Sequence, residues 1–95
     1  MNIKDLHTDT KSVSTASLFK TAEGTVTSIQ ILAGEQLKEH VTKVPALLVC
    51  LAGEALFENE NGIKLTLTTG DYVNIEPNTR HWINAISTSN LILIK

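Results

Sequence analysis

Short stretches of alternating apolar and polar residues run along the chain from Ser14 onward. The clearest is residues 63–68, where isoleucine and leucine alternate with lysine and threonine. That period is typical of a strand with one face in a core and the other in water. Spacing of helical period is confined to the N-terminal residues, where Ile3 and Leu6 permit one short turn.

A nearly continuous apolar run lies in the middle of the chain. Residues 44–52 suit a strand that is covered on both faces, and Pro45 and Gly53 favour a strand over a buried helix. With this run included, the alternation and the β-branched content predict strands within residues 26–32, 37–41, 44–52, 55–59, 63–68, 72–75, 81–87 and 90–94.

Turn residues separate these stretches at regular intervals. Asn61 and Gly62 suit a hairpin turn built from residues with positive φ. Gly70 and Asp71 mark the next turn, and Pro77 marks a loop because it lacks an amide donor. Short antiparallel strands joined in this way predict an all-β sandwich or barrel of about eight or nine strands.

Length and composition limit the chain to one compact unit. It has 95 residues, 42% of them hydrophobic and 19% charged, which is enough to form a core. We expect a single domain over residues 1–95, in which residues 1–13 form a loosely ordered N-terminal segment. Folding at this length buries little more than about 60% of the unfolded chain's surface, so we also expect a homodimer.

Charge and cysteine content exclude several classes of partner and site. The net charge is −2, and a chain without clustered positive charge is a poor match for nucleic acid or an anionic membrane. Cys50 is the one cysteine, which excludes an intrachain disulfide and a cysteine-rich zinc site. Residues 1–6 lack the apolar stretch of a signal peptide, so we expect a cytoplasmic protein.

Two stretches combine an opening glycine with a spaced histidine. Residues 34–53 contain His40 and close on a second glycine, and residues 70–85 contain His81. Both stretches resemble the paired motifs of the cupin superfamily, and in particular those of its small single-domain members. The resemblance implies a jelly-roll barrel, whereas it implies little about function, because one fold hosts many activities.

The resemblance is incomplete at the positions that carry chemistry. In the first motif Thr42 stands where the family has its second histidine, and Ala46 stands where it has a glutamate. In the second motif Glu76 takes the place of a proline, Asn78 that of a glycine, and Ala85 that of the terminal asparagine.

The full family motif holds a divalent transition metal with three histidines and a glutamate, and here only His40 and His81 match it. Two imidazoles predict weak, easily lost binding of Zn, Ni, Mn, Fe or Cu, because catalytic sites usually have about three protein ligands. Replacement ligands are open: Gln36 shares strand parity with His40, Glu76 precedes His81 on a loop, and His7 can fold back. Otherwise we expect no cofactor.

The retained histidines also mark a pocket for a small molecule. We expect His40 and His81 to face each other across the barrel, with Thr42, Leu48 and Cys50 lining the same interior. Cys50 lies on the inward parity with Leu48 and is expected to be a buried apolar residue rather than a nucleophile. Small-molecule binding is therefore the predicted function, and the alternative is a metal-dependent enzyme of isomerase, dioxygenase or lyase type.

Overall fold

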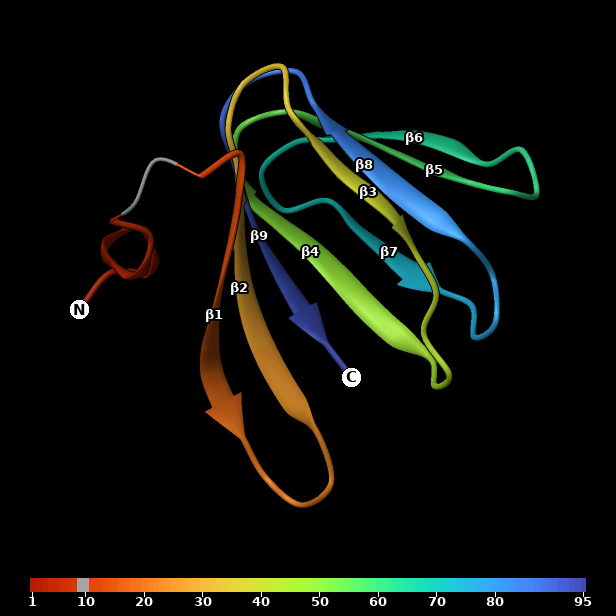
Figure 1. Cartoon of the computed structure of the whole chain (residues 1–95), viewed down its shortest axis with the longest axis horizontal. Coiled ribbons are helices and arrows are strands. Elements are labelled where there is room, and N and C mark those ends of the chain that lie inside the picture. The colour runs from red at the N-terminus through yellow and green to blue at the C-terminus, as the bar shows by residue number, and fades with distance from the viewer. Residues whose placement is uncertain (9–10) are drawn as a thin grey trace.

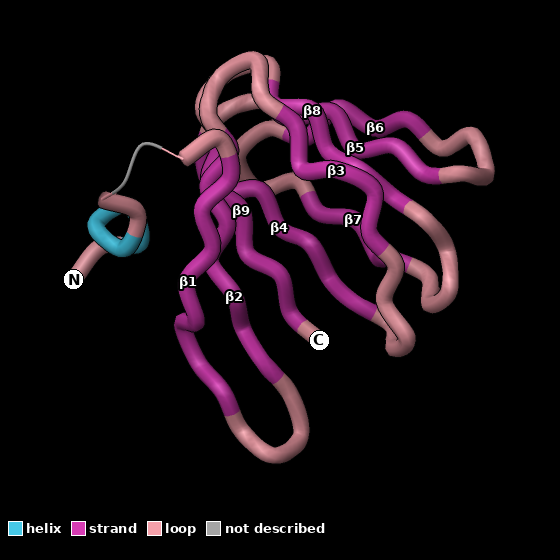
Figure 2. The backbone as a smooth tube through the Cα atoms, in the orientation of Figure 1, coloured by secondary structure: helices cyan, strands magenta, loops and turns pink. Residues whose placement is uncertain are grey.

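The computed structural model describes residues 1–8 and 11–95. Within that part of the chain, one 3-10 turn precedes nine strands, as Figures 1 and 2 show. The elements are η1 (Ile3–Leu6), β1 (Val13–Lys20), β2 (Thr25–Ile31), β3 (Gln36–His40), β4 (Ala46–Ala52), β5 (Ala55–Asn59), β6 (Lys64–Leu67), β7 (Tyr72–Ile75), β8 (His81–Ala85) and β9 (Ser89–Ile94).

The strands form two antiparallel sheets. The larger sheet has the order β1-β2-β9-β4-β7, and the smaller sheet has the order β3-β8-β5-β6. In Figure 1 a group of turns lies at the top of the view, the β1–β2 and β3–β4 connections and the C-terminus lie in its lower part, and the β5–β6 hairpin extends to the right. The predicted all-β architecture is therefore confirmed, and the number of described strands falls within the predicted range.

The inner faces of the two sheets make the hydrophobic core. Its fully buried large side chains include Phe57, Ile83 and Leu91. Leu48 is 1% exposed and Cys50 is 0% exposed, which confirms that both point inward from β4. Aliphatic side chains from facing sheets thus fill the centre of the sandwich.

One turn differs from its prediction. Gly62 has φ of 86°, but Asn61 does not have positive φ. Instead, the side-chain Oδ1 of Asn59 accepts hydrogen bonds from the backbone N–H groups of Asn61 and Ile63, at 3.0 and 3.1 Å. The hairpin thus needs left-handed backbone at the glycine alone, because an asparagine side chain satisfies the turn's amides.

The N-terminal residues are attached to the larger sheet through His7. This side chain is buried, and its Nδ1 and Nε2 atoms lie 2.8 Å from the hydroxyl oxygens of Ser14 and Ser28. Of the expected loosely ordered segment, residues 9 and 10 lie outside the described residues. No helix in the described part of the chain is long and apolar enough to span a membrane.

Candidate functional site

His40 and His81 lie next to each other at the end of the sandwich where β3 leads into β4. His40 is the last residue of β3 and His81 is the first residue of β8, and the two are directly paired in the sheet. Their ring centroids are 6.4 Å apart and their planes are inclined by 36°. The expectation that they face each other across the barrel is wrong, because they belong to neighbouring strands of one sheet.

A β-bulge in β3 gives His40 its orientation. Leu37 pairs with Ile83 and the next pair is His40 with His81, so β3 advances three residues (40 − 37) where β8 advances two (83 − 81). The extra residue places His40 on the inner face with Leu37. Gln36 therefore has the opposite parity from His40, and the shared parity that made it a candidate ligand does not hold.

The surroundings of the two rings differ. His81 is 4% exposed and its ring stacks on Phe57, with centroids 5.8 Å apart and planes inclined by 24°. His40 is exposed to solvent. The site thus has one imidazole that a ligand can reach from solvent, that of His40, beside a buried imidazole, that of His81, which packs against an aromatic ring.

Hydrogen bonds to the backbone fix which nitrogen of each ring carries the proton. Nδ1 of His40 donates to the carbonyl oxygen of Lys38, and Nδ1 of His81 donates to that of Thr79 over 3.4 Å. A carbonyl oxygen only accepts, so in the neutral rings the proton is on Nδ1 and Nε2 presents a lone pair. Nε2 is thus the atom that each ring offers to a ligand.

The buried ring is held in its neutral form. Burial lowers the pKa of His81 below its usual value of 6.5, the hydrogen bond to Thr79 partly opposes this, and the positive charges of His40 and Lys95 lower the pKa further. At neutral pH the His81 side chain therefore acts as an uncharged hydrogen-bonding group rather than as a cation.

Thr42 and Glu76 lie in the two loops beside the histidines. The Thr42 hydroxyl donates to the carbonyl of Val44 at 2.9 Å, and the Thr42 carbonyl accepts from the amide of Asn78 at 2.7 Å. Thr42 is 5% exposed and joins the β3–β4 loop to the β7–β8 loop. Glu76 is exposed on the latter loop.

Leu48 and Cys50 belong to the packed interior. Cys50 lies four residues beyond Ala46 along β4, roughly 13 Å from the histidine end at strand spacing. Burial raises the pKa of the Cys50 thiol, the backbone hydrogen bond with Ala52 partly opposes this, and the charge of Asp71 adds to the rise. The thiol is thus a buried apolar group, as predicted, and lies away from the histidine pair.

His7 lies on the opposite side of the larger sheet. Its partner Ser28 is next in sequence to the core residue Ile29, so the Ser28 side chain points away from the core. Both ring nitrogens of His7 are already bonded to serine hydroxyls. The sheet therefore separates His7 from His40 and His81, so His7 cannot join these two residues as a metal ligand.

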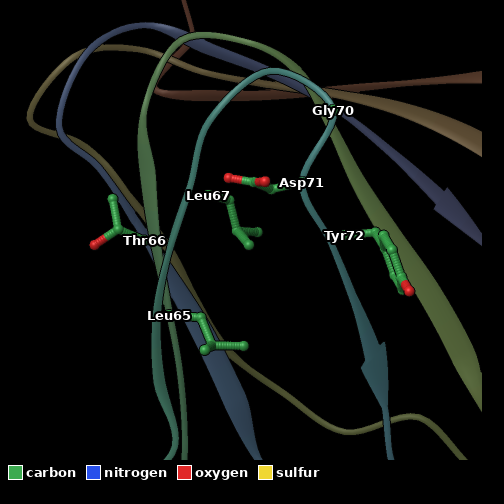
Figure 3. A pocket seen from close by; sticks show the side chains of 6 residues that line it. All are labelled: Leu65, Thr66, Leu67, Gly70, Asp71 and Tyr72. Atoms are coloured by element: carbon green, nitrogen blue, oxygen red, sulfur yellow. The ribbon is translucent and has the colours of Figure 1, made fainter.

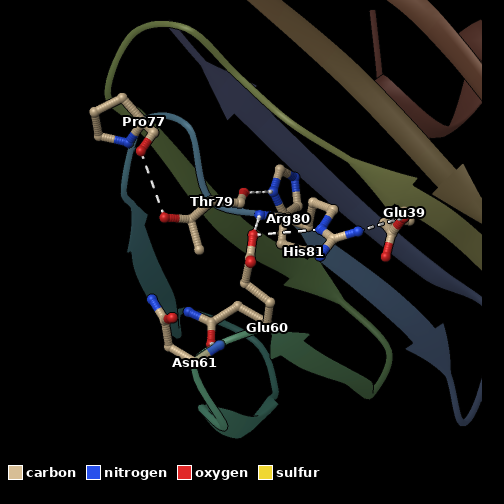
Figure 4. A network of polar contacts seen from close by, with 8 residues as sticks. Glu39, Glu60, Asn61, Pro77, Thr79, Arg80 and His81 are labelled. Atoms are coloured by element: carbon tan, nitrogen blue, oxygen red, sulfur yellow. Dashed lines mark hydrogen bonds and ion pairs between the residues drawn. The ribbon is translucent and has the colours of Figure 1, made fainter.

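An ion-pair network that the sequence reasoning missed lies next to His81 (Figure 4). Arg80 precedes His81 and Glu39 precedes His40, and their charged groups lie 4.0 Å apart. Glu60 also binds Arg80: its carboxylate accepts from the Arg80 amide at 2.5 Å and lies 3.5 Å from the guanidinium. The Arg80 hydrogen bond is the main cause of the lowered pKa of Glu60. The sequence signal for this network is a charged residue directly before each histidine, negative at Glu39 and positive at Arg80.

A separate hollow of about 320 Å³ lies where β6 approaches β7 (Figure 3). Its lining includes Leu65, Leu67 and Tyr72. Asp71 also lines it, and this carboxylate accepts from the Thr68 amide and hydroxyl at 2.8 and 3.0 Å, which lowers its pKa. Neither histidine lines this hollow.

The donor set does not fit a catalytic metal centre supplied by this chain alone. Across residues 1–8 and 11–95, no three His, Cys, Asp or Glu side chains gather in an arrangement that could hold a metal ion. In the same residues, every buried side-chain nitrogen or oxygen atom has a hydrogen-bond partner, so no orphaned donor marks a further ligand position. The two adjacent imidazoles fall short of the usual three protein ligands.

Comparisons with solved structures show what this fold is similar to. A cupin superfamily protein from Desulfitobacterium hafniense superposes with a TM-score of 0.86 at 17% identity, covering 98% of this chain and 84% of that chain. KdgF from a Halomonas species gives 0.81 at 20% identity, with 95% and 87% covered. An RmlC-like cupin with a double-stranded β-helix fold from Methanocaldococcus jannaschii gives 0.79 at 21% identity, with 94% and 84% covered.

At these identities the likeness establishes the fold, a cupin jelly roll, and leaves the activity open. A comparison with curated proteins gives no match. The family model for the cupin domain matches residues 28–94, which is most of the chain and includes both histidine motifs. This chain therefore belongs to the cupin family.

Proposed function

We propose that this protein binds a small molecule at the adjacent imidazoles of His40 and His81. The observation that carries the proposal is their pairing across β3 and β8 with a centroid separation of 6.4 Å. At this separation, one ligand can reach both imidazoles and bind the Nε2 atom of each. The exposed ring of His40 gives access from solvent, and the buried ring of His81 with Phe57 behind it supplies an apolar wall.

The protonation pattern indicates which ligand groups suit the site. Because Nδ1 of each neutral ring donates to a backbone carbonyl, Nε2 accepts hydrogen bonds. The ligand should therefore offer O–H or N–H groups, and the Phe57 side of the site favours an apolar portion. A small hydroxylated or aminated metabolite meets both requirements.

A thermal-shift screen of such metabolites tests this proposal. A ligand that binds only the folded state at a hundredfold excess over its Kd adds about 2.7 kcal/mol to the free energy of unfolding. We expect at least one compound to raise the Tm of the wild-type protein. The His40→Ala and His81→Phe variants should lose this rise, and the second of them retains an aromatic ring beside Phe57.

Gln36→Ala is the matched control, because Gln36 is exposed on the same strand with the opposite parity. It should respond to the compound as the wild-type protein does. A screen in which no compound raises the Tm would remove the proposal, and so would an equal rise in the His40→Ala and His81→Phe variants.

Metal-dependent catalysis of isomerase, dioxygenase or lyase type is the second candidate. Its support is the same adjacency of His40 and His81, and it requires a third ligand supplied by the bound molecule itself. Elemental analysis of freshly purified protein, with separate titrations of Zn, Ni, Mn, Fe(II) and Cu, distinguishes the two candidates. Stoichiometric metal that the His40→Ala/His81→Ala double variant loses supports the metal site that this candidate requires, and identical titrations of both proteins exclude it.

A further inference from the structure

A polar residue stands beside the histidine pair on the inner face of the smaller sheet. Asn59, the last residue of β5, is paired directly with His81, which is itself paired with His40. The three residues therefore form one row across three neighbouring strands, in which directly paired side chains lie about 5 Å apart. The other inward residues of β5, Ala55 and Phe57, are apolar and buried. Asn59 thus interrupts an apolar face at the point where that face meets the histidines.

The carbonyl half of the Asn59 side chain has a structural role. Its Oδ1 atom accepts from the backbone N–H groups of Asn61 and Ile63 at 3.0 and 3.1 Å, which shapes the β5–β6 hairpin. These two donors fix the orientation of the amide, because only its oxygen accepts. Its Nδ2 group makes no hydrogen bond within the described part of the chain, and the side chain is half-buried. The hairpin therefore accounts for Oδ1 and leaves the N–H donors of Nδ2 for another partner.

The facing sheet is apolar at the same end of the sandwich. Ala46 begins β4 and Ile75 ends β7, and these two residues are paired and buried. The loops that follow β3 and β7 bring them to the end at which His40 and His81 lie. A few oriented polar groups beside apolar walls are typical of a small-molecule site.

We propose that Asn59 binds the ligand together with His40 and His81, and that this ligand is an α-hydroxycarbonyl compound. This inference rests on the function proposed above. The Nε2 atoms of the neutral rings accept and so select an O–H group, whereas Nδ2 of Asn59 donates and so selects an acceptor such as a carbonyl oxygen. Paired side chains reach groups that lie close together, so a hydroxyl and a carbonyl on adjacent carbon atoms match the row.

An Asn59→Asp variant changes the donor and keeps the turn. The aspartate retains an oxygen that accepts from the amides of Asn61 and Ile63, and these two hydrogen bonds favour its ionised form. The N–H donor is replaced by an acceptor, to which a hydroxyl group can donate and a carbonyl group cannot. Acetoin and the diol formed by reducing its carbonyl are therefore the matched probes, because they differ at this group alone.

Chemical-shift titrations of the backbone amides give the Kd of each compound. We expect Asn59→Asp to raise the Kd of acetoin about tenfold or more and to leave that of the diol within about a factor of three. Asn61→Asp is the control, because Asn61 is exposed in the same hairpin and the change in charge is the same. It should leave both Kd values as in the wild-type protein. A Tm close to that of the wild-type protein checks that each variant keeps its hairpin.

Three results would overturn the inference: acetoin does not bind the wild-type protein, Asn59→Asp weakens its binding no more than Asn61→Asp does, or Asn59→Asp weakens both compounds alike. The proposed function survives each of them if a compound of another class gives the thermal shift described above. Acetoin that binds the His40→Ala and His81→Phe variants as tightly as the wild-type protein would overturn both proposals, because the histidines would then not form its site.

Discussion

Two positions of the cupin motifs, Gly53 and Asn78, hold residues with left-handed backbone. Asn78 has φ of 61° and is the one non-glycine residue with positive φ in the described chain. It occupies the position at which the family motif has a glycine, and asparagine is the side chain that best tolerates this conformation. Gly53 has φ of 87°, and the backbone of Thr88 and Ser89 packs against it.

Replacing Gly53 should therefore cost more than replacing another turn glycine. A Cβ at Gly53 would meet the Thr88 carbonyl oxygen and lie 2.8 Å from the Ser89 Cα, whereas a Cβ at Gly62 has nothing within 4 Å. We expect Gly62→Ala to lower the free energy of unfolding by about 1–2 kcal/mol and Gly53→Ala by about 2–5 kcal/mol. Urea unfolding of both variants measures the difference, and equal losses would contradict the account of Gly53.

The buried ring of His81 makes stability depend on pH. The folded protein holds His81 neutral, whereas the unfolded chain protonates it near the usual value of 6.5. The unfolded state thus binds the extra proton first, so the free energy of unfolding should fall as the pH drops from about 6.5 through the lowered pKa of the folded protein.

Urea unfolding between neutral pH and pH 5 checks this, with His81→Gln as the comparison. The slope over this range should be shallower in the variant, because its side chain does not titrate. The carboxyl groups of Glu60 and Asp71, whose pKa values lie below the usual 4.5 and 3.8, act in a more acidic range. A variant slope equal to that of the wild-type protein would contradict the assigned burial of His81.

At the scale of elements, the bulge in β3 decides which side chains lie on its inner face, and the hydrogen bonds of His7 attach the N-terminal residues to the larger sheet. The bulge in β3 brings His40 to the inner face beside His81. His7 holds the residues around η1 against β1 and β2 by its bonds to Ser14 and Ser28. Both features depend on strand register, and register decides which side chains share a face.

Removing the His7 ring should release the N-terminal residues from the sheet. His7→Ala leaves the hydroxyl of Ser28, which is 0% exposed, without its partner, and an unsatisfied buried group costs about 1–3 kcal/mol. We expect faster hydrogen exchange in residues 3–8 and a comparable loss of stability. Thr8→Ala, at an exposed position, is the control. Unchanged exchange in His7→Ala would mean that η1 is held by other contacts.

At the scale of the whole molecule, the sequence predicted the fold better than the site. The strands at 55–59 and 72–75 begin and end where their alternation and turn residues predict, because such signals are local. The prediction that Cys50 points inward from β4 was likewise correct. The relative placement of the histidines was wrong, because it depends on which strands are neighbours in a sheet.

The remaining site residues show the same limit. The prediction that Gln36 shares a face with His40 was wrong because of a β-bulge, which the alternation of residues does not reveal. The contact of Phe57 with His81 was not predicted, because it joins two strands, β5 and β8, that are distant in the sequence. Local pattern therefore predicts elements and their inward faces, while the site arises from register between distant segments. The cytoplasmic location and the homodimer remain predictions.

The most direct test of the central claim is a long-range ¹H–¹⁵N spectrum of the histidine rings. The chain has three histidines, so His7 serves as an internal control. At a pH of about 8, above the usual histidine pKa of about 6.5, we predict that His40 and His81 carry their proton on Nδ1. Adding the compound that raises the Tm most should shift their two Nε2 signals and leave those of His7 in place. Shifts confined to His7, or a proton on Nε2 of the free protein's His81, would contradict the account.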